Sequence, residues 1–219
     1  MNILKVFEIF FNNLPAYADG VVTTLLLALI TIVFSTIIGT FIAILRKVKF
    51  IGHFFRFWIS FVRGTPLLVQ VLLFVYGLPP LGIRIPRIIM CTIALINYSS
   101  AYVSEIVRSG VQSVNKNQID AAESLGFNPF QVLVKIIFPQ AIKHTIPALG
   151  NEFIVIIKQS SVLYAVGVYE LTYQANKIAS QNLLYIETMI SAALIYYLIT
   201  LVLTKVLSVV EGRLFRSER

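Results

Sequence analysis

Several charged and amide side chains lie inside long apolar stretches of this chain, where they are costly to keep. A charge near the centre of a bilayer costs about 2.5–3.5 kcal/mol on insertion scales, so such a group is expected to face protein, water or a passing molecule. Glu152 offers a carboxylate that attracts positive charge, and Asn97 offers an amide within the hydroxyl-rich segment INYSSAY. These groups predict a polar pathway through the apolar region, with Asn97 as its leading residue. Its candidate residues are Asn97, Tyr98, Ser100, Glu152, Gln159 and Ser160.

Other interpretations of these positions stay open. Asn97 is also suited to a hydrogen bond between helices. Glu105 and Arg108 stand three residues apart, which favours an ion pair on one helix face. In RGTP, Pro66 removes a helical hydrogen bond and biases the residue before it away from the helical conformation, so a kink is expected. We assign structural roles to Arg63, Gly64, Pro66, Glu105 and Arg108.

The composition determines which elements hold these residues. Hydrophobic residues make up 58% of the 219 positions, charged residues 13%, and the mean hydropathy is +0.84. Such a chain belongs in a bilayer. The apolar runs are continuous and lack a period of two, which favours helices over a barrel and gives an all-α membrane protein. Five spans are expected within a single domain, at about 21–45, 57–78, 88–107, 145–166 and 183–204. The segment IPALGN predicts a break in the fourth span, just before Glu152.

The basic residues predict how the chain is oriented. Twelve Lys or Arg residues fall in one set of loops and termini, including Arg216 and Arg219, whereas the other set holds four. Because basic residues of short loops are retained in the cytoplasm, the larger set is expected there, which puts the N-terminus outside and the C-terminus inside. The net charge of +8 therefore reflects topology, and nucleic-acid binding is not favoured.

The N-terminal residues 1–18 predict an amphipathic helix at the membrane interface. Phe7, Phe10, Phe11 and Leu14 would form its apolar face and Pro15 would end it. A cleaved signal peptide with Ala16-Tyr17-Ala18 as its cleavage site is the alternative.

Motifs of enzymes and metal sites are missing. The single cysteine, Cys91, lies in a predicted span, and His53 and His144 have no partners at ligand spacing. The chain has no phosphate-binding loop of the G-x-x-x-x-G-K-[ST] type. We therefore expect no metal and no cofactor on this chain, and any ATP would be bound by another chain.

A polar hinge interrupts the apolar sequence at residues 120–141, DAAESLGFNPFQVLVKIIFPQA. Asn117 is expected to cap a short helix that ends with Gly126 in a left-handed conformation. Asn128 is then expected to cap a second helix that has Pro129 in its first turn. A helix this short is not stable alone, so its face of Ala121 and Ala122 must pack against something. An ordinary amphipathic connector on the membrane surface is the alternative.

This hinge resembles the EAA loop of ABC importer permeases, in which E-A-A is followed after three residues by Gly and later by I-x-x-P. Ala121, Ala122, Gly126, Ile136 and Pro139 match in place, and Asp120 replaces the first Glu. In that family the loop, here residues 115–141, is a cytoplasmic coupling helix that docks on the ATPase subunit. The resemblance therefore implies coupling roles for Asp120, Ala121, Ala122, Glu123 and Gly126.

Four more segments resemble the polar amino acid permeases of the histidine, glutamine and arginine uptake type. They are RGTPLLVQ (63–70), AYVSEIVRSGVQSV (101–114), FPQAIKHTIPALGNEFI (138–154) and KQSSVL (158–163), and the resemblance covers most of residues 20–205. In the last segment, Gln159 stands where the family has an acidic residue.

The resemblance implies a type I ABC importer in a prokaryotic cytoplasmic membrane. The permease would pair with an identical or homologous copy, bind two ATPase subunits that hold ATP and Mg, and receive an amino acid from an extracytoplasmic binding protein. Glu152 would then attract the ammonium group of an amino acid or a cationic side chain. A secondary transporter and a membrane scaffold without transport are the alternatives, although no internal repeat of the transporter kind is visible.

Overall fold

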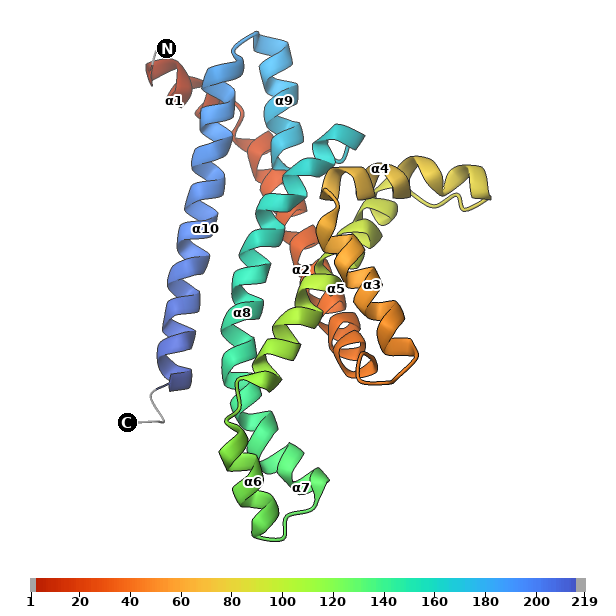
Figure 1. The fold of residues 1–219 in the computed structure, drawn as a ribbon. Coiled ribbons are helices and arrows are strands. Elements are labelled where there is room, and N and C mark those ends of the chain that lie inside the picture. The colour runs from red at the N-terminus through yellow and green to blue at the C-terminus, as the bar shows by residue number, and fades with distance from the viewer. Residues whose placement is uncertain (1–2, 216–219) are drawn as a thin grey trace.

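The protein is a bundle of long helices from which one helical hairpin projects (Figure 1). The computed structural model describes residues 3–215, and these contain helices and turns but no strand. The long helices are α2 (Leu14–Leu45), α5 (Arg87–Gln112), α8 (Phe138–Gln159) and α10 (Tyr185–Phe215). The expected all-α class is therefore confirmed. Arg216 and Arg219, counted above for the orientation, lie outside the described residues, as do residues 1 and 2 of the N-terminal segment.

Length and composition identify fewer spans than the five expected. Leu14–Leu45, Pro129–Val166 and Tyr185–Leu214 are long and apolar enough to cross a bilayer, and the pair Ile51–Gly64 and Leu67–Leu81 adds a fourth if it counts as one broken span. Helix α5 is long enough, but it carries the polar INYSSAY segment and three charges, Arg87, Glu105 and Arg108. The fifth span therefore remains a prediction.

The N-terminal segment ends differently from expectation. Helix α1 (Ile3–Asn12) stops before Pro15, which lies in the first turn of α2. Proline is tolerated there because the first-turn N–H has no helical partner anyway. Val6 and Ile9 are buried in the protein, whereas Phe7, Phe11 and Leu14 are exposed. The amphipathic pattern is therefore present, with Phe10 packed near Tyr17 on the protein side.

The second expected span is broken at the predicted kink. Helix α3 (Ile51–Gly64) and helix α4 (Leu67–Gly77) meet at an angle of 106°, and Thr65 and Pro66 between them have extended backbones. A short 3-10 turn, η1 (Pro79–Leu81), follows α4. The break lies where Pro66 was expected to produce it, but the result is two separate helices.

The expected break at IPALGN is wrong, because α8 runs through Pro147 without interruption. Neighbouring helices support this stretch, and a Cβ on Gly150 would lie only 2.4 Å from Leu207 Cδ1 of α10. The irregular backbone occurs earlier, in the π-helical segment η2 (Leu133–Ile137). Beyond α8 the chain continues as a 3-10 segment, η3 (Ser160–Val166), and then as α9 (Leu171–Asn182).

The core lies where α2, α5 and α8 pack together. Small residues allow close approach: a Cβ on Gly39 of α2 would lie 2.7 Å from Val103 Cγ1 and 2.9 Å from the Ser100 carbonyl oxygen of α5. Apolar side chains of α3 and α4 complete the largest hydrophobic cluster against α5. Helix α5 is thus surrounded by α2, α3, α4 and α8, and its polar residues point at different neighbours.

Candidate functional site

Glu152 is the one charged side chain among the predicted pathway residues, and it contacts α5 directly and α2 through a chain of hydroxyls. Only 8% of its surface is exposed. Its Oε1 lies 3.0 Å from Ser99 Oγ of α5, and that hydroxyl lies 3.2 Å from Ser35 Oγ of α2. The Ser35 hydroxyl lies 3.2 Å from the Ile32 carbonyl oxygen. One carboxylate of α8 therefore holds α5 and α2 through two serines, and in this conformation it is closed off from solvent.

Asn97 lies on a different face of α5 from Ser99. Two residues along a helix correspond to about 200° of rotation, so Asn97 points away from Glu152. Its Nδ2 donates to Gln70 Oε1 of α4 over 3.3 Å. The Gln70 Nε2 in turn lies 2.8 Å from both the Val62 carbonyl oxygen and Thr65 Oγ1, at the break between α3 and α4. Asn97 therefore holds Gln70 in place, and Gln70 supplies the hydrogen bonds for the polar groups at the break between α3 and α4.

A second group of polar side chains links α5 to the end of α3. Tyr98 and Tyr102 are one turn apart, and their hydroxyl oxygens lie 3.0 Å apart. The guanidinium carbon of Arg63 lies 5.3 Å from the centre of the Tyr102 ring, which is a cation–π contact. Arg63 is exposed, Tyr102 is half-buried and Tyr98 is buried, so the α3–α4 break leaves an exposed cation beside two phenols that are largely covered.

Glu105 and Arg108 pair, as their spacing predicts. Arg108 Nη2 lies 2.6 Å from Glu105 Oε2. Arg46, at the end of α2, also approaches Glu105, with 2.5 Å between Nη1 and Oε1. This second cation was not expected, because it comes from a segment 59 residues away. Glu105 thus joins the end of α2 to α5.

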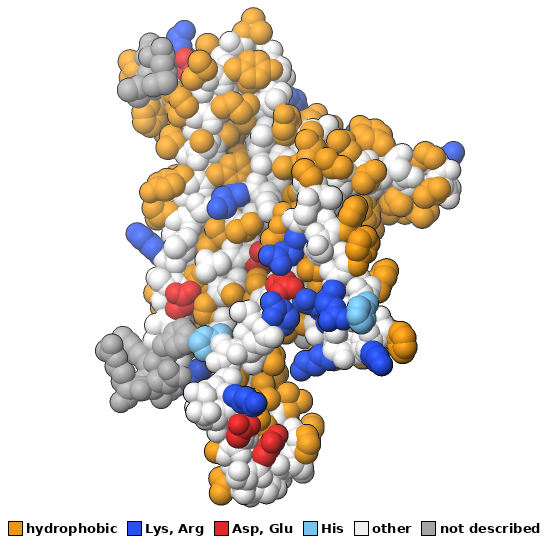
Figure 2. Space-filling model, in the orientation of Figure 1, with side chains coloured by type: hydrophobic (Ala, Val, Ile, Leu, Met, Phe, Trp, Pro, Cys, Tyr) orange, Lys and Arg blue, Asp and Glu red, His pale blue; other side chains and the backbone are white. Residues whose placement is uncertain are grey.

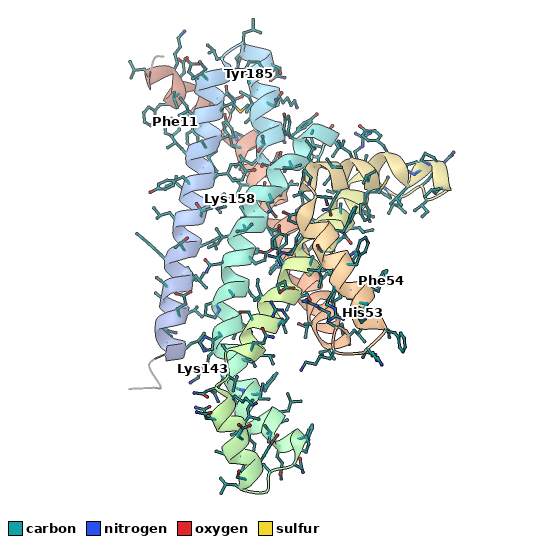
Figure 3. The ribbon with its side chains drawn as sticks, viewed as in Figure 1. Phe11, His53, Phe54, Lys143, Lys158 and Tyr185 are labelled. Atoms are coloured by element: carbon teal, nitrogen blue, oxygen red, sulfur yellow. The ribbon has the colours of Figure 1, made fainter. Side chains whose placement is uncertain are left out.

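The remaining predicted pathway residues are distributed along α5, α8 and η3. Ser100 and Ser160 are buried, and their hydroxyls donate to the carbonyl oxygens of Ile96 and Ile157, one turn earlier in the chain. Gln159 is half-buried, with an Oε1 that has no hydrogen-bond partner among the described residues. Lys158 is exposed on α8 (Figure 3). A groove of about 450 Å³ between α2 and α8 is lined by residues that include Gly150 and Phe153, but by none of the predicted pathway residues.

The projecting hairpin consists of α6 (Lys116–Ser124) and α7 (Pro129–Val132). The cap of α6 is Asn115 and not the expected Asn117, because the Asn115 side chain accepts from the backbone N–H of Asn117. Gly126 has a φ of 83°, the left-handed conformation expected after the helix. Asn128 caps α7, with Gln131 completing a capping box.

The coupling candidates of this hairpin are mostly exposed. Ala122 is buried, whereas Asp120, Ala121 and Glu123 are exposed. Large apolar side chains are exposed at the tip as well, with Leu125 at 78% and Phe130 at 72%. Gln140 of α8 holds the base of α6 by donating to Gln118 over 2.7 Å. The hairpin therefore presents an apolar tip with acidic residues beside it.

Sequence reasoning missed several residues that organise these clusters. Gln70 and Ser99 stand inside segments already singled out, but only the packing reveals their partners. Glu170 is fully buried and caps α9, accepting from the N–H groups of Thr172 and Tyr173 and from the Tyr196 hydroxyl. Its position directly before a helix was the available signal. Within residues 3–215, no group of three His, Cys, Asp or Glu side chains could hold a metal ion.

Comparisons with known proteins agree along most of the chain. Residues 35–216 match the family described as binding-protein-dependent transport system inner membrane component. The probable glutamine ABC transporter permease protein GlnM of Bacillus subtilis (strain 168) is 38% identical, covering 96% of this chain and 98% of its own. The arginine transport system permease protein ArtQ of the same organism is 32% identical, covering 92% and 94%.

Solved structures give the same result. The crystal structure of an amino acid ABC transporter with histidines matches with a TM-score of 0.91 and 39% identity, covering 97% of this chain and 99% of that one. An inward-facing structure of the MetNI methionine ABC transporter matches with a TM-score of 0.73 and 16% identity, covering 93% and 98%. The second match concerns the fold alone.

Proposed function

The chain belongs to the family of binding-protein-dependent transport system inner membrane components, and from this premise we propose that it is the membrane permease subunit of an ATP-driven amino acid importer. It is not the catalytic subunit, since ATP hydrolysis belongs to a separate chain in such systems. The match to an amino acid ABC transporter over 97% of the chain carries this proposal. The relatives are named as a probable glutamine permease and an arginine transport system permease, which supports a polar or charged amino acid as cargo.

We propose that the α6–α7 hairpin couples this chain to the ATPase. Its support is the projecting position (Figure 1), the exposed apolar tip and the acidic side chains of Asp120 and Glu123. ATP and Mg would be bound by the partner, and closure of two ATPases would move two such hairpins. The assembly would contain a second permease copy, identical or homologous, and an extracytoplasmic binding protein. Five spans would place the N-terminus outside and the hairpin and C-terminus in the cytoplasm.

We propose that Glu152 contributes to the substrate pathway. Alternating access would separate α8 from α5 and release the carboxylate from Ser99, so that it can meet an ammonium group. Asn97, Tyr98 and Ser100 would line the pathway from α5, Gln159 from α8 and Ser160 from η3.

The test uses proteoliposomes that contain the permease, its ATPase and its binding protein. Glu152→Gln should abolish uptake of cationic amino acids while assembly and basal ATP hydrolysis persist. Ser99→Ala removes the same interhelical hydrogen bond without removing the charge, and should retain uptake. Equal losses in both variants would mean that Glu152 only holds the helices together.

Two further arms test the transport function itself. Gly126→Ala strains the left-handed backbone at the hairpin and should reduce substrate-stimulated ATP hydrolysis more than basal hydrolysis. Accumulation of amino acid by the permease without ATPase would overturn the importer assignment.

A further inference from the structure

The turn between α2 and α3, together with α3 itself, carries cations without any acidic residue in the same stretch of sequence. Residues 46–63 contain five Lys or Arg and no Asp or Glu. Within the described part of the chain, Lys47, Lys49 and Arg56 form no ion pair, and only Arg46 of this turn reaches a carboxylate, that of Glu105. Figure 2 shows blue side chains gathered on the right of the view, around the region where α3 begins in Figure 1 and above the projecting hairpin. We call Lys47, Lys49 and Arg56 the basic cluster.

Helix α3 places a row of phenylalanines beside this cluster. Phe50, Phe54, Phe57 and Phe61 follow one another at intervals of four, three and four residues, which puts them on one helix face. They are 84%, 63%, 71% and 53% exposed. Ile59 and Val62, on the other face, are buried in the core. We call these four residues the phenylalanine stripe; Figure 3 shows Phe54 and His53 on the outer side of α3.

The location of the basic cluster fixes its surroundings. Leu45 ends one apolar span, and Ile51 begins the broken span, so the turn between them lies at a membrane surface. Cations at that level meet phosphate groups, and aromatic side chains just beyond them meet acyl chains. A soluble protein partner would complement the cations but would not need the stripe.

We propose that the basic cluster and the phenylalanine stripe form a binding site for anionic phospholipid, with the cluster holding the phosphate-bearing headgroup and the stripe lying against its acyl chains. The site would enrich anionic lipid around α3. It is separate from the predicted pathway residues and from the α6–α7 hairpin, and it does not depend on the identity of the transported amino acid.

The chain contains its own reporter, since Trp58 is the one tryptophan of the sequence and lies on α3. The full-length chain would be reconstituted in vesicles of equal phosphatidylglycerol and phosphatidylcholine. In parallel samples one of the two lipids carries brominated acyl chains, which quench nearby tryptophan. For the wild type, phosphatidylglycerol should be favoured over phosphatidylcholine near Trp58 by about fivefold or more, the factor expected for one basic side chain at an anionic surface.

The variants assign the preference to named residues. The triple change Lys47→Gln, Lys49→Gln and Arg56→Gln should reduce the ratio to about one. The double change Lys205→Gln and Arg213→Gln removes basic side chains of α10 and should leave the ratio at the wild-type value. Equal quenching by both brominated lipids in the wild type would overturn the proposal. Weak quenching of Trp58 by both brominated lipids would overturn it as well, because it would mean that protein and not lipid covers the phenylalanine stripe.

Discussion

At the scale of single residues, three buried polar side chains of this membrane protein, Glu152, Gln70 and Glu170, each join two or more elements. Glu152 reaches α5 and α2 through serines, and Gln70 joins α4, α3 and α5. Glu170 caps α9 and accepts from Tyr196 of α10. A buried polar group without a partner would be costly, so these pairings determine which helices can lie together.

Glu170 gives a prediction about pH. It lies between the candidate spans that end at Val166 and begin at Tyr185, and burial raises the pKa of its carboxyl group above the usual value. A raised folded-state pKa favours the protonated folded state, so the contribution of this group to stability is full below its unfolded pKa of about 4.3 and declines as the pH rises through the folded pKa. Between the unfolded pKa and the raised folded pKa, the unfolding temperature of the wild type should therefore fall with increasing pH, and that of Glu170→Gln should vary less.

Thermal unfolding in detergent at a series of pH values measures this difference. Glu211→Gln, which changes a carboxylate with no resolved interaction in the described structure, is the matched control and should follow the wild type. Parallel pH profiles for Glu170→Gln and the wild type would contradict the prediction.

At the scale of elements, the break between α3 and α4 separates two helices that a straight span would have joined. Pro66 starts the break, but the amide of Gln70 satisfies the groups that the break leaves free, at Val62 and Thr65. Arg63 lies in the last turn of α3, directly before this bend, and its guanidinium group lies over the Tyr102 ring. The contact between Arg63 and Tyr102 therefore depends on a bend that a buried glutamine supports.

Gln70→Leu should destabilise the protein by about 1–3 kcal/mol, since it leaves buried carbonyl oxygens and the Asn97 amide without their partner. The decrease in the unfolding temperature measures this. Gln181→Leu, at an exposed position of α9, makes the same chemical change without buried partners and should have little effect. An equal decrease in both variants would show that the bend does not need the amide.

At the scale of the whole molecule, the three-helix core depends on close approach between backbones. Gly39 of α2 faces Val103 and Ser100 of α5 with no room for a methyl group. This contact brings Ser35 and Ser99 into the range of Glu152, because Ser35 is one turn from Gly39 on α2. Helix separation during transport would have to open the same contact.

Gly39→Ala should lower stability by about 1–3 kcal/mol, because the added methyl group forces α2 and α5 apart. Gly77→Ala is the control, since a Cβ there meets nothing within 4 Å. The two unfolding temperatures provide the comparison. A Gly39→Ala protein as stable as Gly77→Ala would mean that the helices can shift at no cost.

The sequence by itself determined the all-α class, the family and the local shape of the hinge. Continuous apolar runs exclude alternating strands, and Gly126, Asn128 and Pro129 have the local roles that their conformational preferences predict. The kink at Pro66 was also predictable, because a proline removes the hydrogen bond of its own residue. These are local properties that need no knowledge of distant neighbours.

Only the tertiary structure decided which polar residues meet. The sequence placed Asn97 and Glu152 on one pathway, whereas the structure directs Asn97 to Gln70 and Glu152 to Ser99, on different faces of α5. Glu105 pairs with Arg46, which lies 59 residues away in the sequence, and α8 remains one continuous helix through Pro147, with Leu207 of α10 packed close to Gly150. Periodicity tells which face of a helix a residue occupies, but the rotation of each helix in the bundle results from the packing of all of them together.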